Sequence, residues 1–255
     1  AWWPKQSLAV FQPLIPPDWK MTLRDGALYA QVAFSAAADQ GFEAGGHGVL
    51  KSGSAWMPDN QINGVDFVLP FRFSEGTWSL GTRGPVTLRI GEVVNLVTAR
   101  NITADLQGDY PWTEDNPLLL TNVKVETLGG KITMQQLRMP QHDPALLRVD
   151  NISSSELISA VNPKQFAMSG PVSGALPFWL DNEKWIIKDG WLTNPGPMTL
   201  RIDKDTADAI VKDNMVAGAA INWLRYMEIS RSWTRINLDN LGELTMQATI
   251  KGTSR

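Results

Sequence analysis

Histidine is the side chain best suited to acid–base catalysis near neutral pH, and this chain has only two, His47 and His142. Both lie next to or near glycine or proline, so we expect them in solvated loops. A serine nucleophile would need a strained turn such as Gly-x-Ser-x-Gly, which the sequence lacks. Thiol nucleophiles and zinc–thiolate sites are excluded because there is no cysteine. We therefore predict that the protein is not an enzyme.

Acidic residues are the other candidates for chemistry. Glu114 and Asp115 could serve as a glycosidase pair, but they lie in a polar turn segment. The acidic segment 203–208 lacks the glycine and the distal glutamate of a calcium loop, and we expect it to begin a helix. The glycine-rich stretch 41–53 lacks the Gly-Lys-Ser ending of a phosphate loop and is predicted to be a turn between strands. No metal and no cofactor are predicted.

The overall composition excludes further classes of function. The net charge of −3 means that basic residues are not in excess, as they are in most proteins that bind nucleic acids. We therefore predict no nucleic-acid partner. The 11 tryptophans keep a glycan-binding surface open as an alternative. No apolar run reaches about 18 residues, so we expect no membrane-spanning segment within this chain. The first residues do not resemble a signal peptide, and we expect a mature or excised segment.

Strict alternation of apolar and polar residues dominates the chain and predicts half-buried β-strands. The clearest run is 65–73, where every second residue is apolar, although Pro70 within it is typical of an edge or bulged strand. Turn signals recur every 8 to 14 residues or so, which favours an all-β sheet. Two helices are expected as well: a short one that a capping box begins at Ser153 and Glu156, and a long amphipathic one over 205–229.

The alternation is compatible with two architectures. In a closed β-sandwich or solenoid, the apolar faces pack against one another, and the protein is a structural or adhesive module that binds a protein or a glycan. In an open, curved sheet, the same faces line a groove and meet acyl chains. Burial of a chain of about 16 carbons contributes roughly 10 kcal/mol before ordering costs, so the second architecture can bind lipid.

One stretch of the sequence carries a family resemblance. Its motifs are Gly170-x-Val172-Ser173-Gly174-x-Leu176-Pro177, then Ile186-x-Lys188-Asp189-Gly190-x-Leu192, then Pro195-Gly196. In this order, and followed by a helix, they resemble the carboxy-terminal domain of the YdbH family, which belongs to the AsmA-like and TamB-like group of bacterial envelope proteins. The resemblance covers about residues 120–252.

The resemblance implies a mainly β fold: a long curved antiparallel sheet (β-taco or β-groove) with one long helix near the C-terminus and short helices. It also implies one elongated domain over 1–255, within which 1–117 and 118–255 could be sub-parts. The alternating apolar residues then become candidates for the groove lining: Val65, Phe67, Leu69, Phe71, Phe73, Leu88, Ile90, Met198, Leu200, Ile202, Ile236, Leu238, Leu244, Met246 and Ile250.

The resemblance further implies a function and partners. Proteins of this group form bridges that carry phospholipid across the periplasm between the inner and outer membranes. Phospholipid is therefore the expected ligand, and an inner-membrane anchor is expected outside this chain. A small outer-membrane lipoprotein is expected to add a strand to the last edge strand, whose residues are Leu244, Thr245, Met246, Gln247, Ala248, Thr249 and Ile250.

Overall fold

A computed structural model describes residues 2–39, 41–161, 166–181, 184–213 and 226–254. It is mainly β, and its seventeen strands belong to one antiparallel sheet, which confirms the predicted fold class. The chain divides into two compact units. Unit 1 comprises residues 1–126 and 133–145, and unit 2 comprises 127–132 and 146–255. The expectation of a single elongated domain stays a prediction.

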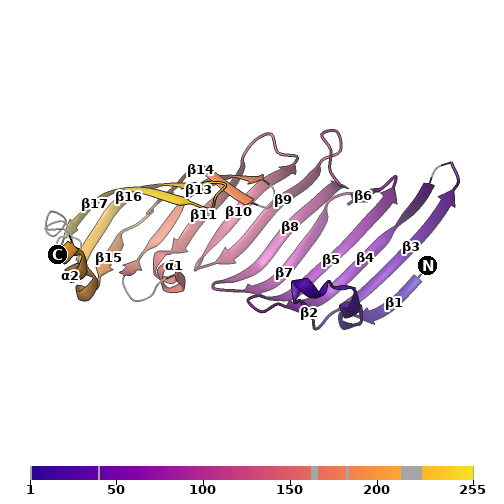
Figure 1. Ribbon diagram of the computed structural model, residues 1–255, viewed down its shortest axis with the longest axis horizontal. Helices are drawn as coiled ribbons and strands as arrows, with labels where there is room; N and C mark the ends of the chain where they lie inside the picture. Colours follow the sequence, from indigo (N-terminus) through magenta and orange to yellow (C-terminus); the bar gives the residue numbers. More distant parts are fainter. Residues whose placement is uncertain (1, 40, 162–165, 182–183, 214–225, 255) are drawn as a thin grey trace. The chain divides into compact units, whose positions relative to one another are not determined.

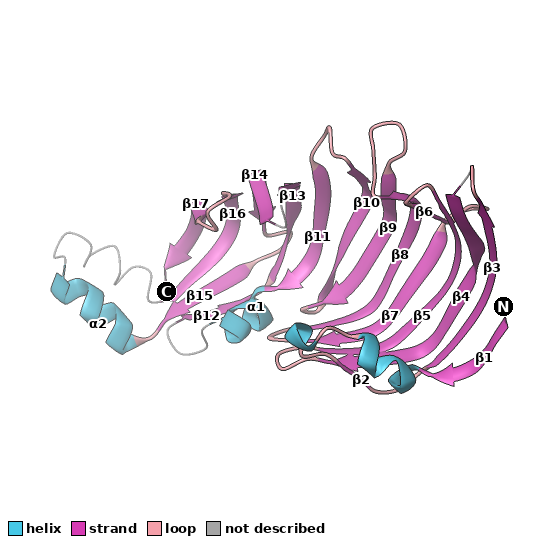
Figure 2. Ribbon diagram, turned by 45° about the vertical axis from the view of Figure 1, so that its right-hand side comes forward, coloured by secondary structure: helices cyan, strands magenta, loops and turns pink. Residues whose placement is uncertain are grey.

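Unit 1 is a sheet of strands joined mostly by short turns (Figure 1). Its 3₁₀ helices are η1 (Leu8–Leu14) and η2 (Pro17–Trp19). Its strands are β1 (Trp2–Ser7), β2 (Thr22–Leu23), β3 (Ala27–Ala37), β4 (Gly41–Trp56), β5 (Gln61–Ser74), β6 (Thr77–Leu80), β7 (Val86–Val94), β8 (Thr98–Tyr110), β9 (Leu118–Thr127) and β10 (Gly130–Met139). Figure 2 shows that β4, β5, β7 and β8 bend along their length, so this part of the sheet has a concave side.

Unit 2 adds further strands and two helices. Its elements are β11 (Ala145–Ser153), α1 (Ser154–Val161), β12 (Phe166–Ser169), β13 (Pro171–Asp181), β14 (Lys184–Thr193), β15 (Met198–Ile202), α2 (Lys204–Asp213), β16 (Tyr226–Leu238) and β17 (Leu244–Ser254). A small core of Met198, Met227 and Ile229 joins β15 to β16, with Leu200 packed against it. Among the described helices, none is long and apolar enough to cross a membrane.

Both predicted helix starts are confirmed by side-chain caps. The Ser153 hydroxyl accepts a hydrogen bond from the Glu156 N–H at 3.3 Å, at the start of α1. Asp203 Oδ1 accepts one from the Thr206 N–H at 2.6 Å, at the start of α2. This bond and the Thr206 hydroxyl hold the pKa of Asp203 below its usual value. Both caps satisfy N–H groups that have no partner within the helix.

The predicted extent of the long helix is wrong at its C-terminal end. The described part of α2 ends at Asp213, and residues 214–225 of the predicted helix lie outside the described residues. Residues 226–229 belong to β16, where Met227 and Ile229 are buried on either side of half-buried Glu228. Four residues are too few to distinguish the repeat of a helix from the alternation of a strand. Here the hydrogen-bonded pairing with β15 makes the segment a strand.

Candidate functional site

The ladder register of unit 1 places the predicted groove residues of β5 and β7 on one face of its sheet. Directly paired residues of an antiparallel ladder lie on the same face. Five paired residues form a row across five strands, in the order Leu28, Leu50, Phe67, Leu88 and Ala104. The neighbouring rows add the other predicted residues, which are Val65, Leu69, Phe71, Phe73 and Ile90. We call this surface the apolar face.

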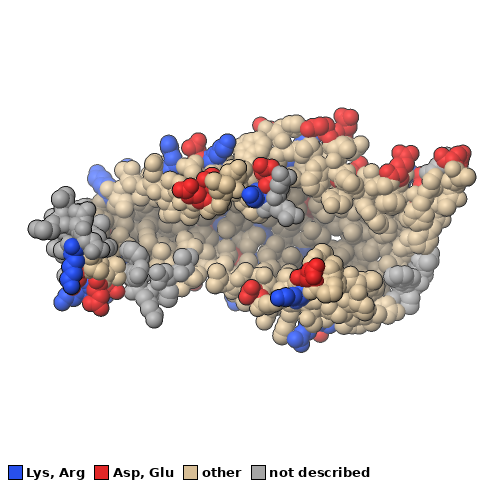
Figure 3. Space-filling model, in the orientation of Figure 1, with Lys and Arg blue, Asp and Glu red and all other residues tan. Residues whose placement is uncertain are grey.

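The apolar face is half-exposed rather than sealed. The seven predicted residues on β5 and β7 are all partly exposed, whereas Leu50 and Val86 of the same face are buried. The face is therefore partly open to solvent. Figure 3 shows a hollow in this part of the molecule that contains few charged side chains, while most acidic and basic groups lie at its borders. A surface of this kind can bind an apolar ligand along several strands.

Two glycines on β4 have no side chain and so leave space on the apolar face beside two large apolar residues of β5. Gly46 is paired with Phe71 and Gly48 with Leu69. A Cβ at Gly46 would overlap the Gln31 carbonyl of β3, so this position requires glycine. The predicted turn over 41–53 is therefore wrong, because these glycines lie within β4. The predicted loop position of His47 is wrong for the same reason.

Pro70 lies at a point of β5 where a neighbouring strand does not need its backbone N–H. β5 is an interior strand that pairs with β4 along one edge, but beside Pro70 its other edge has no ladder partner, so the predicted edge is present locally. Along its other edge β5 changes partner, from β7 at residues 61–67 to β6 at residues 71–74. The Pro70 carbonyl accepts from the Gly81 N–H at 3.0 Å on this second edge. The missing N–H therefore points to the gap between β6 and β7, where no ladder bond is lost.

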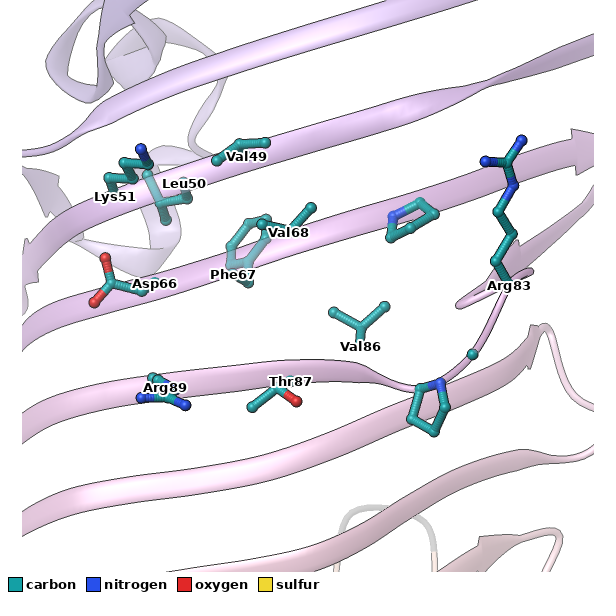
Figure 4. Close-up of a pocket in the computed structure, with 13 residues that line it drawn as sticks. Val49, Leu50, Lys51, Asp66, Phe67, Val68, Arg83, Val86, Thr87 and Arg89 are labelled. Atoms are coloured by element: carbon teal, nitrogen blue, oxygen red, sulfur yellow. The ribbon is translucent and has the colours of Figure 1, made fainter.

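The opposite face of unit 1 is polar and carries a hollow that the sequence did not indicate. The hollow has a volume of about 540 Å³ and lies where β5 changes partner. Figure 4 shows its lining, which includes Val49, Val68, Lys51, Arg83 and Arg89. Arg89 is paired with Asp66 across the β5–β7 ladder, and Val49 with Val68 across the β4–β5 ladder, on the face opposite Phe67. Only the arrangement of β6 and β7 around Pro70 creates this hollow, so no local pattern could predict it.

Two of the candidates for catalysis, His142 and Glu114, meet at the surface of the protein. His142 Nε2 lies 2.6 Å from Glu114 Oε2, and Arg138 also lies beside that carboxylate at 3.9 Å. The His142 and Glu114 side chains are 58% and 64% exposed, so the contact joins two surface loops. His142 does lie in a loop, as predicted. The described residues hold no group of three or more metal-ligating side chains.

The predicted residues of unit 2 also share one face, but their burial differs. Met198 and Leu200 are paired with Ile229 and Met227 of β16, and beyond a bulge at 229–231 the same face continues to Ile236 and Leu238. The facing residues of β17 are Leu244, Met246 and Ile250. Met198, Ile202 and Ile236 are less than 9% exposed, whereas Leu244, Met246 and Ile250 are 42–60% exposed. The buried residues of this face thus form a local core, whereas the part of the face on β17 is exposed.

β17 is an edge strand in the described part of the chain. It pairs with β16 over residues 244–254, and no other described strand pairs with it. All residues from Leu244 to Ile250 are exposed. The free backbone groups of such an edge can pair with an added strand.

A carboxylate on the polar face of unit 1 makes stability depend on pH. Asp105 of β8 accepts hydrogen bonds from Asn122 Nδ2 at 3.0 Å and from the Thr87 hydroxyl at 2.8 Å. These bonds hold the pKa of Asp105 below its usual value, with Asn122 the larger cause. Because the folded-state pKa is the lower one, the carboxylate stabilises the fold above the unfolded-state pKa of about 3.9, and this contribution is lost as pH falls through the folded-state pKa.

We expect the substitution Asp105→Asn to lower the free energy of unfolding at pH 7 by less than about 1 kcal/mol, because the group is partly exposed. The difference from the unsubstituted chain should shrink at pH 3. Urea unfolding at both pH values measures it. An equal difference at the two pH values would show that the carboxylate charge is not the cause.

Comparison with known proteins shows which family the chain belongs to. Residues 1–255 match the model of the YdbH-like family, which is described as the intermembrane phospholipid transport protein YdbH. The chain belongs to this YdbH-like family, which confirms the resemblance that the sequence indicated. It is similar to a protein of Escherichia coli strain K12 named probable phospholipid transport protein YdbH, with 82% identity over 255 residues. The chain spans 29% of that relative's length. No solved structure matches it.

Proposed function

We propose that this chain is a non-enzymatic segment of an intermembrane phospholipid-transport protein, and that its apolar face shelters acyl chains. The observation that carries the proposal is the continuous, half-exposed apolar face that five strands of unit 1 build in register. The family description and the name of the E. coli relative agree with it. Each methylene that moves from water to such a face contributes about 0.8 kcal/mol.

The proposal includes a place in the cell envelope. A phospholipid that travels between two membranes must cross the aqueous periplasm, where its acyl chains need an apolar cover. The proposed location is therefore the periplasm of a Gram-negative cell, with an inner-membrane anchor outside this chain. The proposed groove lining comprises the predicted residues of both units, of which Met198, Ile202 and Ile236 support the face from within the core.

Native mass spectrometry of the purified 255-residue chain tests the proposed function. The chain is expressed in a bacterial periplasm and purified without detergent, and its bound lipids are extracted and identified. We expect a diacyl phospholipid to remain bound. A chain that is folded, as judged by circular dichroism, but reproducibly free of phospholipid after incubation with phospholipid vesicles would contradict the proposal.

The exposed edge of β17 supports a second part of the proposal, which is strand addition by a small outer-membrane lipoprotein. A photo-crosslinking amino acid at Met246 should capture such a lipoprotein in cells, because an added strand would lie directly beside this edge. Trp233 of β16 is the matched control, since it is 49% exposed but is paired with Thr193 of β14 on one side and with Thr249 of β17 on the other. Mass spectrometry identifies the product by its acylated N-terminal peptide. Equal capture from both positions, or none from Met246, would argue against strand addition.

A further inference from the structure

One border of the apolar face is lined by aromatic rings, whereas its middle is mostly aliphatic. Six residues form this border, and we call them the aromatic row: Phe34, Phe42, Phe73, Trp78, Tyr110 and Trp112. The ring centroids of Phe34 and Phe42 lie 5.9 Å apart, those of Phe42 and Phe73 6.0 Å, and those of Phe73 and Trp78 4.8 Å. Trp78 is paired with Tyr110 across the β6–β8 ladder, and the Tyr110 ring lies 5.8 Å from that of Trp112. The row therefore crosses β3, β4, β5, β6 and β8.

The aromatic row lies on the apolar face and at one end of its strands. Phe34 and Phe73 are both paired with Ala44, and Phe42 is paired with Ala36, so these rings share the face of Leu69 and Phe71. The residues next in sequence belong to the β3–β4 turn, the β5–β6 turn and the loop after β8, which lie along the upper edge of Figure 1. Phe34 is 62% exposed and Tyr110 is 54% exposed. A contiguous set of exposed rings of this size marks a binding surface.

The chemistry of the row differs from that of the aliphatic middle. Tryptophan and tyrosine combine an apolar ring with one polar group, and such side chains gather where acyl chains meet headgroups. Exposed ring faces also attract ammonium groups. The chain itself shows this contact at the other end of β4, where the Arg24 guanidinium lies 3.9 Å from the ring centroid of Trp56. Among the described residues, no lysine or arginine lies over a ring of the aromatic row in this way.

The charges beside the row complement an ammonium group. Asp39 lies in the β3–β4 turn, Glu75 in the β5–β6 turn and Asp115 in the loop after β8. None of the three forms an ion pair with a described residue. Figure 3 shows that acidic side chains predominate along this edge of the hollow. Arg72, the basic residue on the neighbouring part of β5, lies on the opposite face, paired with Ser79.

We infer that the headgroup end of a bound phospholipid leaves the apolar face over the aromatic row, and that the row favours headgroups that carry an ammonium group. This inference rests on the proposed function and adds to it the orientation and headgroup class of the lipid. The acyl chains lie along the aliphatic middle of the face. The ammonium group lies against the ring faces and near the carboxylates of the turns, whereas a headgroup with net negative charge is repelled there.

A competition between headgroups tests the inference on the full 255-residue chain. The chain is incubated with vesicles of equal parts phosphatidylethanolamine and phosphatidylglycerol with identical acyl chains, and the bound lipids are counted by mass spectrometry. We expect phosphatidylethanolamine to exceed phosphatidylglycerol roughly threefold, as exposed charge interactions allow. Phosphatidylcholine in place of phosphatidylethanolamine should show the same preference, because the ammonium charge is recognised.

Substitutions in and beside the aromatic row test whether the row causes the preference for phosphatidylethanolamine over phosphatidylglycerol. Trp78→Leu keeps the site apolar, and Glu75→Gln keeps its size, and each should move the ratio of the two bound lipids towards one. Asp59→Asn, in the turn at the opposite end of β5, is the matched control and should leave the ratio unchanged. Phe42→Leu replaces Trp78→Leu if a thermal melt shows that the latter unfolds.

The failures of the two proposals are distinguishable. A folded chain that binds no lipid of either kind would overturn the proposed function and the inference together. Bound lipid with a ratio near one, or with phosphatidylglycerol in excess, would overturn the inference alone. So would a preference that Trp78→Leu and Glu75→Gln leave intact.

Discussion

Leu69→Asp is expected to reduce the phospholipid bound by this chain at least about tenfold, which corresponds to roughly 1.4 kcal/mol or more of binding free energy. Leu69 lies on the apolar face, paired with Gly48, and its side chain is partly exposed. A carboxylate at this position would have to lose water when an acyl chain covers it, and this desolvation costs several kcal/mol without a partner. The measurement is the lipid extracted from equal amounts of folded protein.

The adjacent residue supplies a matched control. Val68 is 55% exposed and lies on the opposite, polar face, paired with Val49. Val68→Asp introduces the same charge one residue away, and should leave bound phospholipid within twofold of the unsubstituted chain. Thermal melts separate loss of lipid from loss of fold. If both variants lose lipid equally while folded, or if neither loses any, the apolar face is not the lipid site.

Asn194→Ala is expected to lower the free energy of unfolding by about 3 kcal/mol, since it leaves several buried backbone groups without partners. Asn194 is 8% exposed and lies in the turn between β14 and β15. Its Nδ2 donates to the carbonyls of Gly196 at 2.7 Å and of Ile229 and Ser230 at 3.3 Å. Its Oδ1 accepts from the Ser232 N–H at 2.6 Å and from the Ser232 hydroxyl at 2.9 Å. The side chain thus holds the turn against the bulge of β16.

A second asparagine of unit 2 serves as the control for this prediction. Asn237 Oδ1 accepts one exposed hydrogen bond, from the Asp189 N–H at 2.9 Å. Asn237→Ala should therefore cost about 1 kcal/mol or less. Urea unfolding gives the two free energies, and hydrogen exchange of the β15 and β16 amides shows whether the loss is local. Similar costs for the two variants would mean that the buried network around Asn194 is not what stabilises this turn.

Local patterns predicted those parts of the structure that depend on neighbours within a few residues. Alternation over 65–73 identified β5 and the face of each of its residues, because successive strand side chains point to opposite sides. Ser153 and Asp203 indicated the starts of two helices, because their side chains bond to N–H groups three residues onward. The motifs between Gly170 and Gly196 identified the family.

Other features depended on which strands become neighbours. The glycine-rich stretch 41–53 predicts a turn, yet these glycines lie within β4 because β3 and β5 pair on both sides of them. The same partners decide that Pro70 meets the gap between β6 and β7, and that Met227 and Ile229 extend a strand rather than a helix. The Asn194 network likewise joins residues that are 35 to 38 positions apart.

The order of residues along the chain is therefore enough to identify a mainly β member of the YdbH-like family, with apolar side chains on alternate positions of its strands. The pairing of the strands leaves these side chains partly exposed on unit 1 and buries several of them in a core on unit 2. It also brings six aromatic residues from five strands and a loop together at one border. The physical reason is that periodicity along a strand depends on backbone geometry alone, whereas exposure depends on the strands that pair with it and on whether a second layer covers it.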